Sequence, residues 1–165
     1  LPIGEIGQIC AKGPQIMKGY WNKKEESEKA LKGGWMHTGD AGRMDEEGFV
    51  FIQDRIKDMI VSGGENIYST EVEAALFAHP DVVDAAVIGV PDEKYGEVVK
   101  ACIVKKEGSN VTEDDLISFC KDRIASYKKP QSVDFIDEVP RNASGKVLKK
   151  VLREPYWKDQ ERQVS

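Results

Sequence analysis

The sequence predicts an α+β fold: the end of a β-rich subdomain that contains a hairpin, followed by a small mixed α/β domain with a central antiparallel sheet and about three helices. Two observations predict it. The first part of the chain shows alternating and hairpin patterns, and the later part alternates apolar, β-branched runs with helical patterns. The charge-rich segment Asp54 to Lys57 interrupts the apolar pattern between them. We therefore divide the chain into a β-rich part, a boundary, a second domain and a polar tail, at residues 1–53, 54–57, 58–157 and 158–165.

The β-rich part has three expected elements. Residues 4–12 alternate apolar and polar side chains, as a half-buried strand does. Asn22 is placed to cap a short charged helix over residues 23–31. Residues 41–44 and 49–53 flank the turn Asp45-Glu46-Glu47-Gly48, which predicts a β-hairpin.

The second domain is expected to centre on two long strands. Residues 82–90 and 98–104 are apolar, β-branched runs that a turn at Pro91 to Gly96 joins, so they are predicted to pair antiparallel. Shorter strands are expected over residues 58–61 and 133–136.

Three helices are expected in the same domain. Thr70 and Glu73 form a capping-box pattern ahead of an apolar face made by Val72, Leu76 and Phe77, and Pro80 ends that helix. Thr112 and Asp115 predict the cap of a second helix, and residues 147–152 a third. Two capping boxes are thus predicted from the same spacing.

Composition excludes several classes of partner. The 165 residues carry a formal net charge of −5, so there is no basic field for nucleic acid or an anionic membrane. No apolar run approaches the roughly 20 residues of a membrane span. Cys10, Cys102 and Cys120 lie among apolar neighbours and are expected to be buried, reduced thiols, which favours a cytoplasmic protein.

The segment Pro140-Arg141-Asn142-Ala143-Ser144-Gly145-Lys146 is the strongest functional candidate. A loop of Pro, Asn, Ser and Gly has little to pack, so it can present its lysine as a mobile cation to a ligand's negative charge. Taken alone, a Gly-Lys pair at the start of a surface helix is more often just a solvated turn. Two upstream strings accompany it, Trp35-Met36-His37-Thr38-Gly39-Asp40 and Asp54 to Asn66.

These three strings, in this order, resemble the adenylate-forming superfamily of acyl- and aryl-CoA synthetases, adenylation domains and firefly-type luciferases. The resemblance covers nearly all of this chain but only the last third of a family member. It implies that residues 1–53 end a large N-terminal domain that binds ATP and the acyl group, that residues 54–57 are a hinge, and that residues 58–157 are a C-terminal lid. The family's own N-terminal domain is then an implied partner.

The resemblance implies a nucleotide site at Asp40 and Arg55. A carboxylate at position 40 can accept hydrogen bonds from two ribose hydroxyls, and Arg55 is the second ribose or phosphate contact. The alternatives are a turn aspartate and a surface ion pair of Arg55 with Asp54 or Asp58. Lys57 occupies the family's hinge position, and its alternative is a plain exposed lysine.

A CoA site is implied in the second domain. Two successive glycines let a backbone approach a ligand closely, and exposed tyrosines or lysines can meet adenine or phosphate. The alternatives are an ordinary turn for the glycines and hydrophobic shielding for the tyrosines. The implied CoA-binding residues are Gly63, Gly64, Tyr95, Tyr127 and Lys129.

The implied activity is that of an AMP-forming acid–CoA ligase. Lys146 would be catalytic in forming an acyl-adenylate from a carboxylic acid and ATP, and rotation about Lys57 would then present the glycine turn for thioester formation with CoA. Mg²⁺ would be bound mainly by the N-terminal domain, and no metal site is expected in this chain. The run Leu152 to Trp157 is similar to fatty acyl-CoA synthetases, so a fatty acid is the expected substrate.

Three alternatives stay open for the activity. An adenylation domain that loads a carrier protein shares the first half-reaction. A luciferase-type enzyme shares the acyl-adenylate. The non-enzymatic alternative is a ligand-binding fragment, and we expect the 165-residue chain by itself to be inactive.

Overall fold

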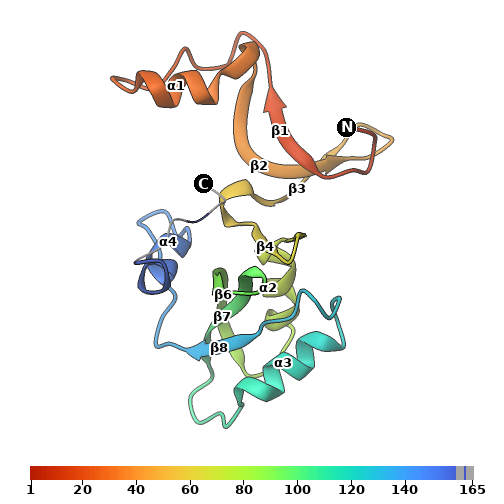
Figure 1. Ribbon diagram of the computed structural model, residues 1–165, viewed down its shortest axis with the longest axis vertical. Helices are drawn as coiled ribbons and strands as arrows, with labels where there is room; N and C mark the ends of the chain where they lie inside the picture. Colours follow the sequence, from red (N-terminus) through yellow and green to blue (C-terminus); the bar gives the residue numbers. More distant parts are fainter. Residues whose placement is uncertain (159–161, 163–165) are drawn as a thin grey trace. The chain divides into compact units, whose positions relative to one another are not determined.

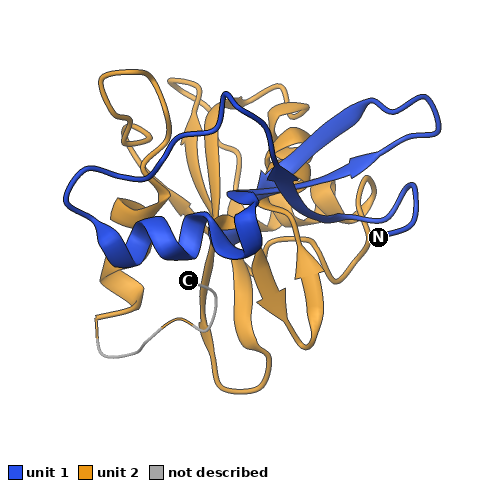
Figure 2. Cartoon of the chain, turned by 90° about the horizontal axis from the view of Figure 1, so that it is seen from above, with its two compact units in different colours: residues 1–57 blue, residues 58–165 orange. Residues whose placement is uncertain are grey.

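The computed structural model describes residues 1–158 and 162. The chain forms two compact units, Leu1–Lys57 and Asp58–Ser165, which Figure 2 colours separately. Most of the predicted polar tail, residues 158–165, lies outside the described residues. Each unit is described by itself below.

The first unit is a three-stranded antiparallel sheet in the order β1-β2-β3 (Figure 1). The expected hairpin is present, and the strand predicted near the start of the chain joins it as a third member. The elements of this unit are β1 (Gly7–Ala11), α1 (Lys24–Ala30), the 3₁₀ turn η1 (Lys32–Gly34), β2 (Met36–Met44) and β3 (Val50–Arg55).

Two expectations for the first unit are wrong. Asn22 does not cap α1: the N-cap residue is Lys23, and Asn22 instead adopts a left-handed backbone with φ of +53°. This conformation is one that Asn tolerates better than most side chains, so Asn22 serves the turn rather than the helix. Cys10 is exposed rather than buried, whereas Cys102 and Cys120 are buried, and all three thiols are free.

The second unit is built on a five-stranded sheet with strand order β5-β4-β7-β6, and β8 also pairs with β7. The predicted central pair is confirmed, because β6 and β7 pair antiparallel from Val82–Lys105 to Asp92–Gly96. β8 lies parallel to β7, as a strand that returns through a helix can. The strands are β4 (Ile60–Ser62), β5 (Glu65–Ile67), β6 (Val82–Asp92), β7 (Gly96–Lys105) and β8 (Ser132–Phe135).

Both faces of the β6–β7 pair are covered, which explains why these strands read as nearly continuous apolar runs. Side chains such as Val87 and Ala101 point into the main core, which includes residues of α2 and α3. The alternate side chains Ile88 and Cys102 belong to a second cluster. Leu152 and Tyr156 of the C-terminal segment, residues 149–157, pack against it. The alternation follows from the two-residue period of a strand. The C-terminal segment is therefore part of the folded unit.

The predicted helices are present as α2 (Ser69–Phe77), α3 (Glu113–Lys121) and the short α4 (Lys149–Arg153), which the 3₁₀ turn η3 (Glu154–Tyr156) follows. The capping box at α3 is confirmed: Thr112 Oγ1 accepts from the Asp115 N–H at 3.3 Å, and Asp115 Oδ2 accepts from the Thr112 N–H at 3.0 Å. The capping box predicted for α2 is wrong. That helix begins after Tyr68 with no side-chain cap, and Phe77 on its expected apolar face is exposed.

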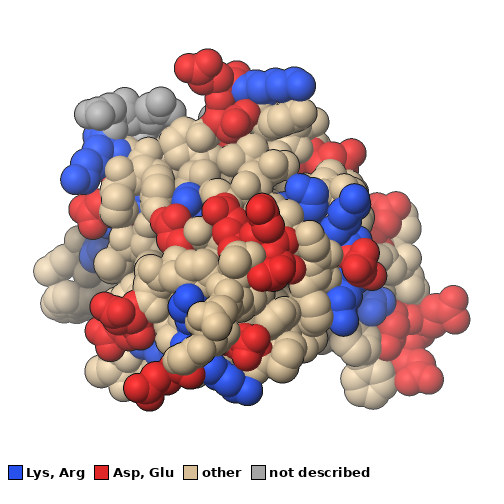
Figure 3. All heavy atoms as spheres, turned by 90° about the horizontal axis from the view of Figure 1, so that it is seen from below, with Lys and Arg blue, Asp and Glu red and all other residues tan. Residues whose placement is uncertain are grey.

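The surface carries charges of both signs. On the face shown in Figure 3, basic and acidic side chains are interspersed and no continuous basic area is visible. Within residues 1–158 and 162, no helix has the length and apolar character that a membrane span requires.

Candidate functional site

Asp40 and Arg55 lie side by side on neighbouring strands. Asp40 of β2 is the register partner of Arg55 of β3, and Arg55 Nε is 3.7 Å from Asp40 Oδ1. The guanidinium of Arg55 thus pairs with Asp40, while the Arg55 backbone N–H donates to Asp54 Oδ1 at 2.7 Å. Because 3.7 Å exceeds hydrogen-bond length, the pair is an electrostatic contact at a half-exposed position. A carboxylate and a guanidinium therefore share one small area of surface.

The backbone before Asp40 has a special conformation. Gly39 has φ of +80°, a value that side chains rarely adopt. Thr38 Oγ1 accepts from the Asp40 N–H at 3.1 Å and donates to the Ile9 carbonyl at 2.9 Å. The Thr38-Gly39 sequence thus fixes the position of Asp40 relative to β1.

Lys57 stands at the division between the units, because unit 1 ends with this residue. It lies in the 3₁₀ turn η2 (Ile56–Asp58) rather than in a strand. The next residue, Asp58, is held within unit 2 by Arg153, whose Nη1 donates to Asp58 Oδ1 at 2.9 Å. A short turn between two separately packed bodies has the geometry that a hinge needs.

Gly63, Gly64 and Tyr95 come together in unit 2. The two glycines form the tight turn between β4 and β5 with φ of +59° and +89°. The Gly63 N–H donates to the Tyr95 carbonyl at 2.9 Å. A Cβ on Gly63 would lie 3.2 Å from Tyr95 Cδ1, so any side chain there would press on the ring. The surface beside Gly64 is open backbone next to a half-exposed tyrosine.

Tyr127 and Lys129 lie in the connection between α3 and β8. Tyr127 is exposed, while the intervening Lys128 binds both carboxylate oxygens of Glu71 on α2 at 2.8 Å. The hydrogen bond that Lys128 donates to Glu71, opposed in part by burial, raises the pKa of Lys128. Lys128 is therefore committed to holding this connection on α2, and no described contact joins Tyr127 or Lys129 to the Gly63 turn.

Lys146 follows a turn that is more ordered than its composition suggests. The Gly145 N–H donates to the Asn142 carbonyl, and Asn142 Oδ1 accepts from the N–H groups of Ser144 and Lys146, at 3.0 and 2.9 Å. The Asn142 N–H donates to the Lys146 carbonyl at 2.9 Å. The turn packs against little, as expected, since residues 141–146 are all exposed, but its backbone is bonded internally through the Asn142 side chain. The ammonium itself is on an exposed residue.

The chain after Lys146 is anchored through Lys149. Its ammonium lies 2.7 Å from Glu73 Oε1 and donates to Ser69 Oγ at 2.5 Å, and both residues are on α2. Glu73 Oε1 also accepts from the Val87 N–H of β6 at 2.8 Å. Glu73 therefore joins α2, α4 and β6, which explains why it is absent from the helix cap.

A second polar cluster holds the end of the chain. Asp134 of β8 accepts from Lys100 Nζ at 2.7 Å and from the Tyr156 hydroxyl. Burial opposes ionisation of Asp134, but the two hydrogen bonds and the Lys100 charge outweigh it and lower its pKa. Burial, helped by the Asp134 charge, raises the pKa of the neighbouring Cys102 thiol to about 11. Cys102 is therefore a packing residue and not a nucleophile.

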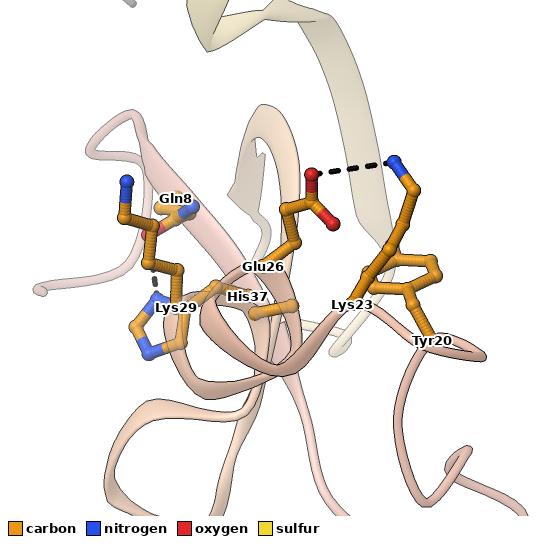
Figure 4. Close-up of a pocket in the computed structure, with 7 residues that line it drawn as sticks. Gln8, Tyr20, Lys23, Glu26, Lys29 and His37 are labelled. Atoms are coloured by element: carbon orange, nitrogen blue, oxygen red, sulfur yellow. Dashed lines mark hydrogen bonds and ion pairs between the residues drawn. The ribbon is translucent and has the colours of Figure 1, made fainter.

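Unit 1 has a hollow of about 520 Å³ beside α1. Figure 4 shows side chains that line it. Its lining includes His37, whose Nδ1 is 2.8 Å from Gln8 Oε1, and Lys23, which pairs with Glu26 at 3.2 Å. None of the site residues predicted from the sequence lines it. His37 is bonded within its own unit.

The part of the chain that the structure describes holds no group of three or more His, Cys, Asp or Glu side chains able to bind an ion. We therefore assign no Mg²⁺ ligand here.

Comparison with known proteins relates part of the chain to one family. Residues 71–146 match the AMP-binding enzyme C-terminal domain, and these residues include the ordered turn before Lys146. Nearly half of the chain thus matches the C-terminal domain of AMP-binding enzymes.

Relatives match over nearly the whole chain. A fatty acid–[acyl-carrier-protein] ligase of Streptomyces coeruleorubidus is 46% identical over 100% of the chain and 32% of its own length. A long-chain-fatty-acid–CoA ligase of Bacillus subtilis is 50% identical over 91% of the chain and 27% of its own length. The crystal structure of ATP-bound MatB from Rhodopseudomonas palustris superposes with a TM-score of 0.89 at 43% identity, over 94% of this chain and 31% of that one. The chain spans about a third of the length of these relatives.

Sequence reasoning missed the residues that hold the Lys146 segment in place. Arg141, Lys149 and Glu73 make long-range ion pairs that no local pattern reveals. The sequence does single out Glu73, because its spacing from Thr70 fits a capping box, but that pattern predicts the wrong partner for its carboxylate. Asn142 could have been found, because Asn in a turn commonly bonds the backbone that follows it.

Proposed function

We propose that this chain is part of an AMP-forming acid–CoA ligase, which first makes an acyl-adenylate from a carboxylic acid and ATP and then an acyl-CoA thioester. The observation that carries the proposal is the division of the chain directly after Lys57. Asp40 and Arg55 lie in one unit, whereas Lys146 and the Gly63-Gly64 turn lie in the other. One hinge can then bring two different parts of unit 2 to the same bound nucleotide in turn.

Asp40 and Arg55 are proposed to hold the nucleotide. The Asp40 carboxylate accepts hydrogen bonds only, so adjacent ribose hydroxyls are suitable donors to it. The guanidinium of Arg55 can present hydrogen-bond donors to a ribose oxygen or a phosphate. Their mutual distance of 3.7 Å leaves room for hydroxyls to replace a weak contact with stronger ones.

Lys146 is proposed to act in the first half-reaction. As the carboxylate attacks the α-phosphate, negative oxygens converge and pyrophosphate leaves with the bonding electron pair. An ammonium at that point attracts both anions and stabilises the charge of the transition state. The ordered turn before Lys146 fixes its backbone, so little reorganisation is needed when the ligands arrive.

The Gly63-Gly64 turn is proposed to line the path of the pantetheine arm. A turn without Cβ atoms exposes its backbone, and Tyr95 provides an aromatic surface beside it. Tyr127 and Lys129 are proposed as contacts to the CoA nucleotide, by stacking and by charge. CoA thiolate then attacks the acyl carbon, and AMP leaves with the electrons of the broken acyl–phosphate bond.

A fatty acid is the proposed substrate, because both fatty-acid ligases above are similar to nearly all of this chain. None of the residues proposed above determines which carboxylic acid the enzyme accepts. A second acceptor has specific support: the Streptomyces relative is named for an acyl carrier protein rather than for CoA. A carrier protein's own pantetheine arm would present the same thiol to the same glycine turn.

The test separates the two half-reactions in the full-length enzyme. We expect Lys146→Ala to reduce pyrophosphate release by about 10²–10³-fold, as loss of one transition-state contact does. Thioester formation from supplied acyl-adenylate should be nearly unchanged. We expect the opposite pattern for Gly64→Ala, with Gly108→Ala as a control for backbone strain, because Gly108 also has a positive φ and open space around it.

Three outcomes would count against the proposal. Equal loss of both half-reactions in Lys146→Ala would contradict the division of roles. Equal effects of the two glycine variants would remove the pantetheine assignment. Release of pyrophosphate by the 165-residue chain alone would contradict the need for the rest of the enzyme.

A further inference from the structure

The turn that precedes Lys146 is fixed internally by Asn142, but internal bonds do not place it relative to the rest of unit 2. A cation that must meet two anions needs its backbone held in the frame of the domain that carries it. The geometry points to Arg141 as the residue that does this, by joining the Gly145 carbonyl to Asp84 of β6. This inference deepens the proposed function and rests on it.

The contacts of Arg141 run in two directions. Nη2 donates to both carboxylate oxygens of Asp84, at 2.9 and 2.8 Å, and Nη1 donates to the carbonyl oxygen of Gly145 at 3.0 Å. Gly145 immediately precedes Lys146. The planar guanidinium keeps its nitrogens at fixed angles, so the Gly145 carbonyl takes a defined position relative to Asp84.

Asp84 is itself rigidly placed. It lies on β6, the strand that pairs with β7 along almost its whole length, and it follows a shift in the strand register between Val82 and Asp84. Its Oδ1 also accepts from the Ala85 N–H at 2.9 Å, which restricts the side-chain rotation. Ala85 belongs to the buried core. The connection therefore runs from the core sheet through one carboxylate and one guanidinium to the residue before Lys146.

The two ends of the turn are joined to each other beside Arg141. Arg141 and Val147 form an isolated antiparallel bridge, and the Leu148 N–H donates to the Pro140 carbonyl at 2.8 Å. These bonds close the ends of the segment on each other. They do not fix the orientation of the segment relative to the sheet. The contact of Arg141 with Asp84 fixes that orientation.

The solvent exposure of the Arg141–Asp84 pair indicates that the pair positions the turn rather than stabilises the fold. The side chains of Arg141 and Asp84 are 42% and 24% exposed, so their ion pair adds little to the stability of the fold. The core of the unit and the buried Lys149 anchor remain when this pair is removed. Loss of the Arg141 side chain should consequently leave a folded enzyme in which the Lys146 ammonium is displaced from the reacting groups.

The experiment uses the full-length enzyme and compares wild type with Arg141→Ala, Arg141→Lys and Asp84→Asn. The rate and KM of pyrophosphate release measure adenylation, and thioester formation from supplied acyl-adenylate measures the second half-reaction. Thr112→Ala is the control, because it removes a helix cap of the same unit and makes no contact with the Lys146 turn.

We expect Arg141→Ala to lower the kcat of adenylation about 10- to 100-fold, since small displacements of reacting groups have effects of this size. KM for ATP and the second half-reaction should change by less than about threefold, which is smaller than the adenylation effect. Arg141→Lys should recover only part of the rate, because one ammonium cannot reproduce the fork that spans Asp84 and Gly145. Asp84→Asn should show the same selective loss although it lies further from Lys146.

The outcomes separate this inference from the proposed function. If Lys146→Ala abolishes adenylation but Arg141→Ala matches Thr112→Ala, the positioning role is refuted and the proposed function stands. If Arg141→Ala is impaired in adenylation and Asp84→Asn is not, the role of the Arg141–Asp84 ion pair in placing the turn is refuted. If wild type releases no pyrophosphate with any carboxylic acid, both the proposed function and this inference fail.

Discussion

Replacing Glu73 with alanine tests how the C-terminal segment is held to the second unit. Glu73 binds Lys149 of α4 at 2.7 Å and accepts from the Val87 N–H of β6 at 2.8 Å. The side chains of Lys149 and Glu73 are only 10% and 16% exposed. In Glu73→Ala the Lys149 ammonium keeps Ser69 Oγ as a partner but loses its counter-charge in a poorly solvated place.

The size of the effect follows from this burial. Breaking a buried ion pair by removing one partner costs about 3–5 kcal/mol, and the residual exposure places this pair near the lower end, at about 3 kcal/mol. The Val87 amide also loses its acceptor, a cost that overlaps with the first. A loss of about 3 kcal/mol raises the unfolded fraction by about a hundredfold.

The assay is urea unfolding of unit 2, followed through the fluorescence of Trp157. Its Nε1 donates to the Gly89 carbonyl at 3.0 Å, so its environment changes when the segment detaches. Trp21 and Trp35 of unit 1 are replaced by phenylalanine so that only one indole reports. Arg141→Ala is the matched control in the same unit, because the Arg141–Asp84 pair is 42% and 24% exposed and its loss should cost less than about 1 kcal/mol.

A double replacement makes the reasoning refutable. Glu73→Met with Lys149→Met removes both charges together, and it should be more stable than either single variant because no unpaired charge remains. The reasoning is refuted if Glu73→Ala costs no more than Arg141→Ala, or if the effects of Glu73→Met and Lys149→Met simply add in the double variant.

Further predictions concern thiols and acid. Burial raises the pKa of Cys102 and Cys120 to about 11, so in the folded protein both should resist iodoacetamide at about pH 8 and react only after denaturation; rapid labelling of either in the native state, read by mass spectrometry, would contradict this. The pKa of Asp134 is lowered in the folded state, so its contribution to stability is full above the ordinary aspartate value of 3.8 and is lost as pH falls through the lowered value. The stability difference between wild type and Asp134→Asn should therefore shrink below pH 3.8, and a difference that stays constant there would show that the carboxylate is not stabilising.

Sequence patterns predicted a helix cap correctly where the hydrogen bonds that the pattern implies are also the ones formed in the folded protein. Thr112 and Asp115 form the capping box that their spacing predicts, because no other group competes for either side chain at that exposed position. Thr70 and Glu73 have the same spacing, yet Glu73 turns to a lysine and a backbone N–H from distant segments. A buried cation attracts a carboxylate more strongly than a helix end does.

The candidate site shows the same limit. The motif before Lys146 identified the segment, but its composition predicted a loosely held loop. Its order comes from Asn142, a short-range bond that was predictable in principle, and from Arg141, whose partner Asp84 is 57 positions away. No periodicity in the sequence predicts such a pairing. The exposed Cys10 likewise has apolar neighbours in sequence but lies on a strand whose face is open in this structure.

The central claim is that rotation at Lys57 separates the two half-reactions, and single-turnover rates of Lys57→Pro in the full-length enzyme test it most directly. Proline fixes φ and restricts the residue before it, whereas the control Lys57→Ala removes the side chain and leaves the backbone free. We predict that Lys57→Pro retains adenylation but slows thioester formation by at least about tenfold, and that Lys57→Ala retains both. Unchanged thioester formation in Lys57→Pro would contradict the account.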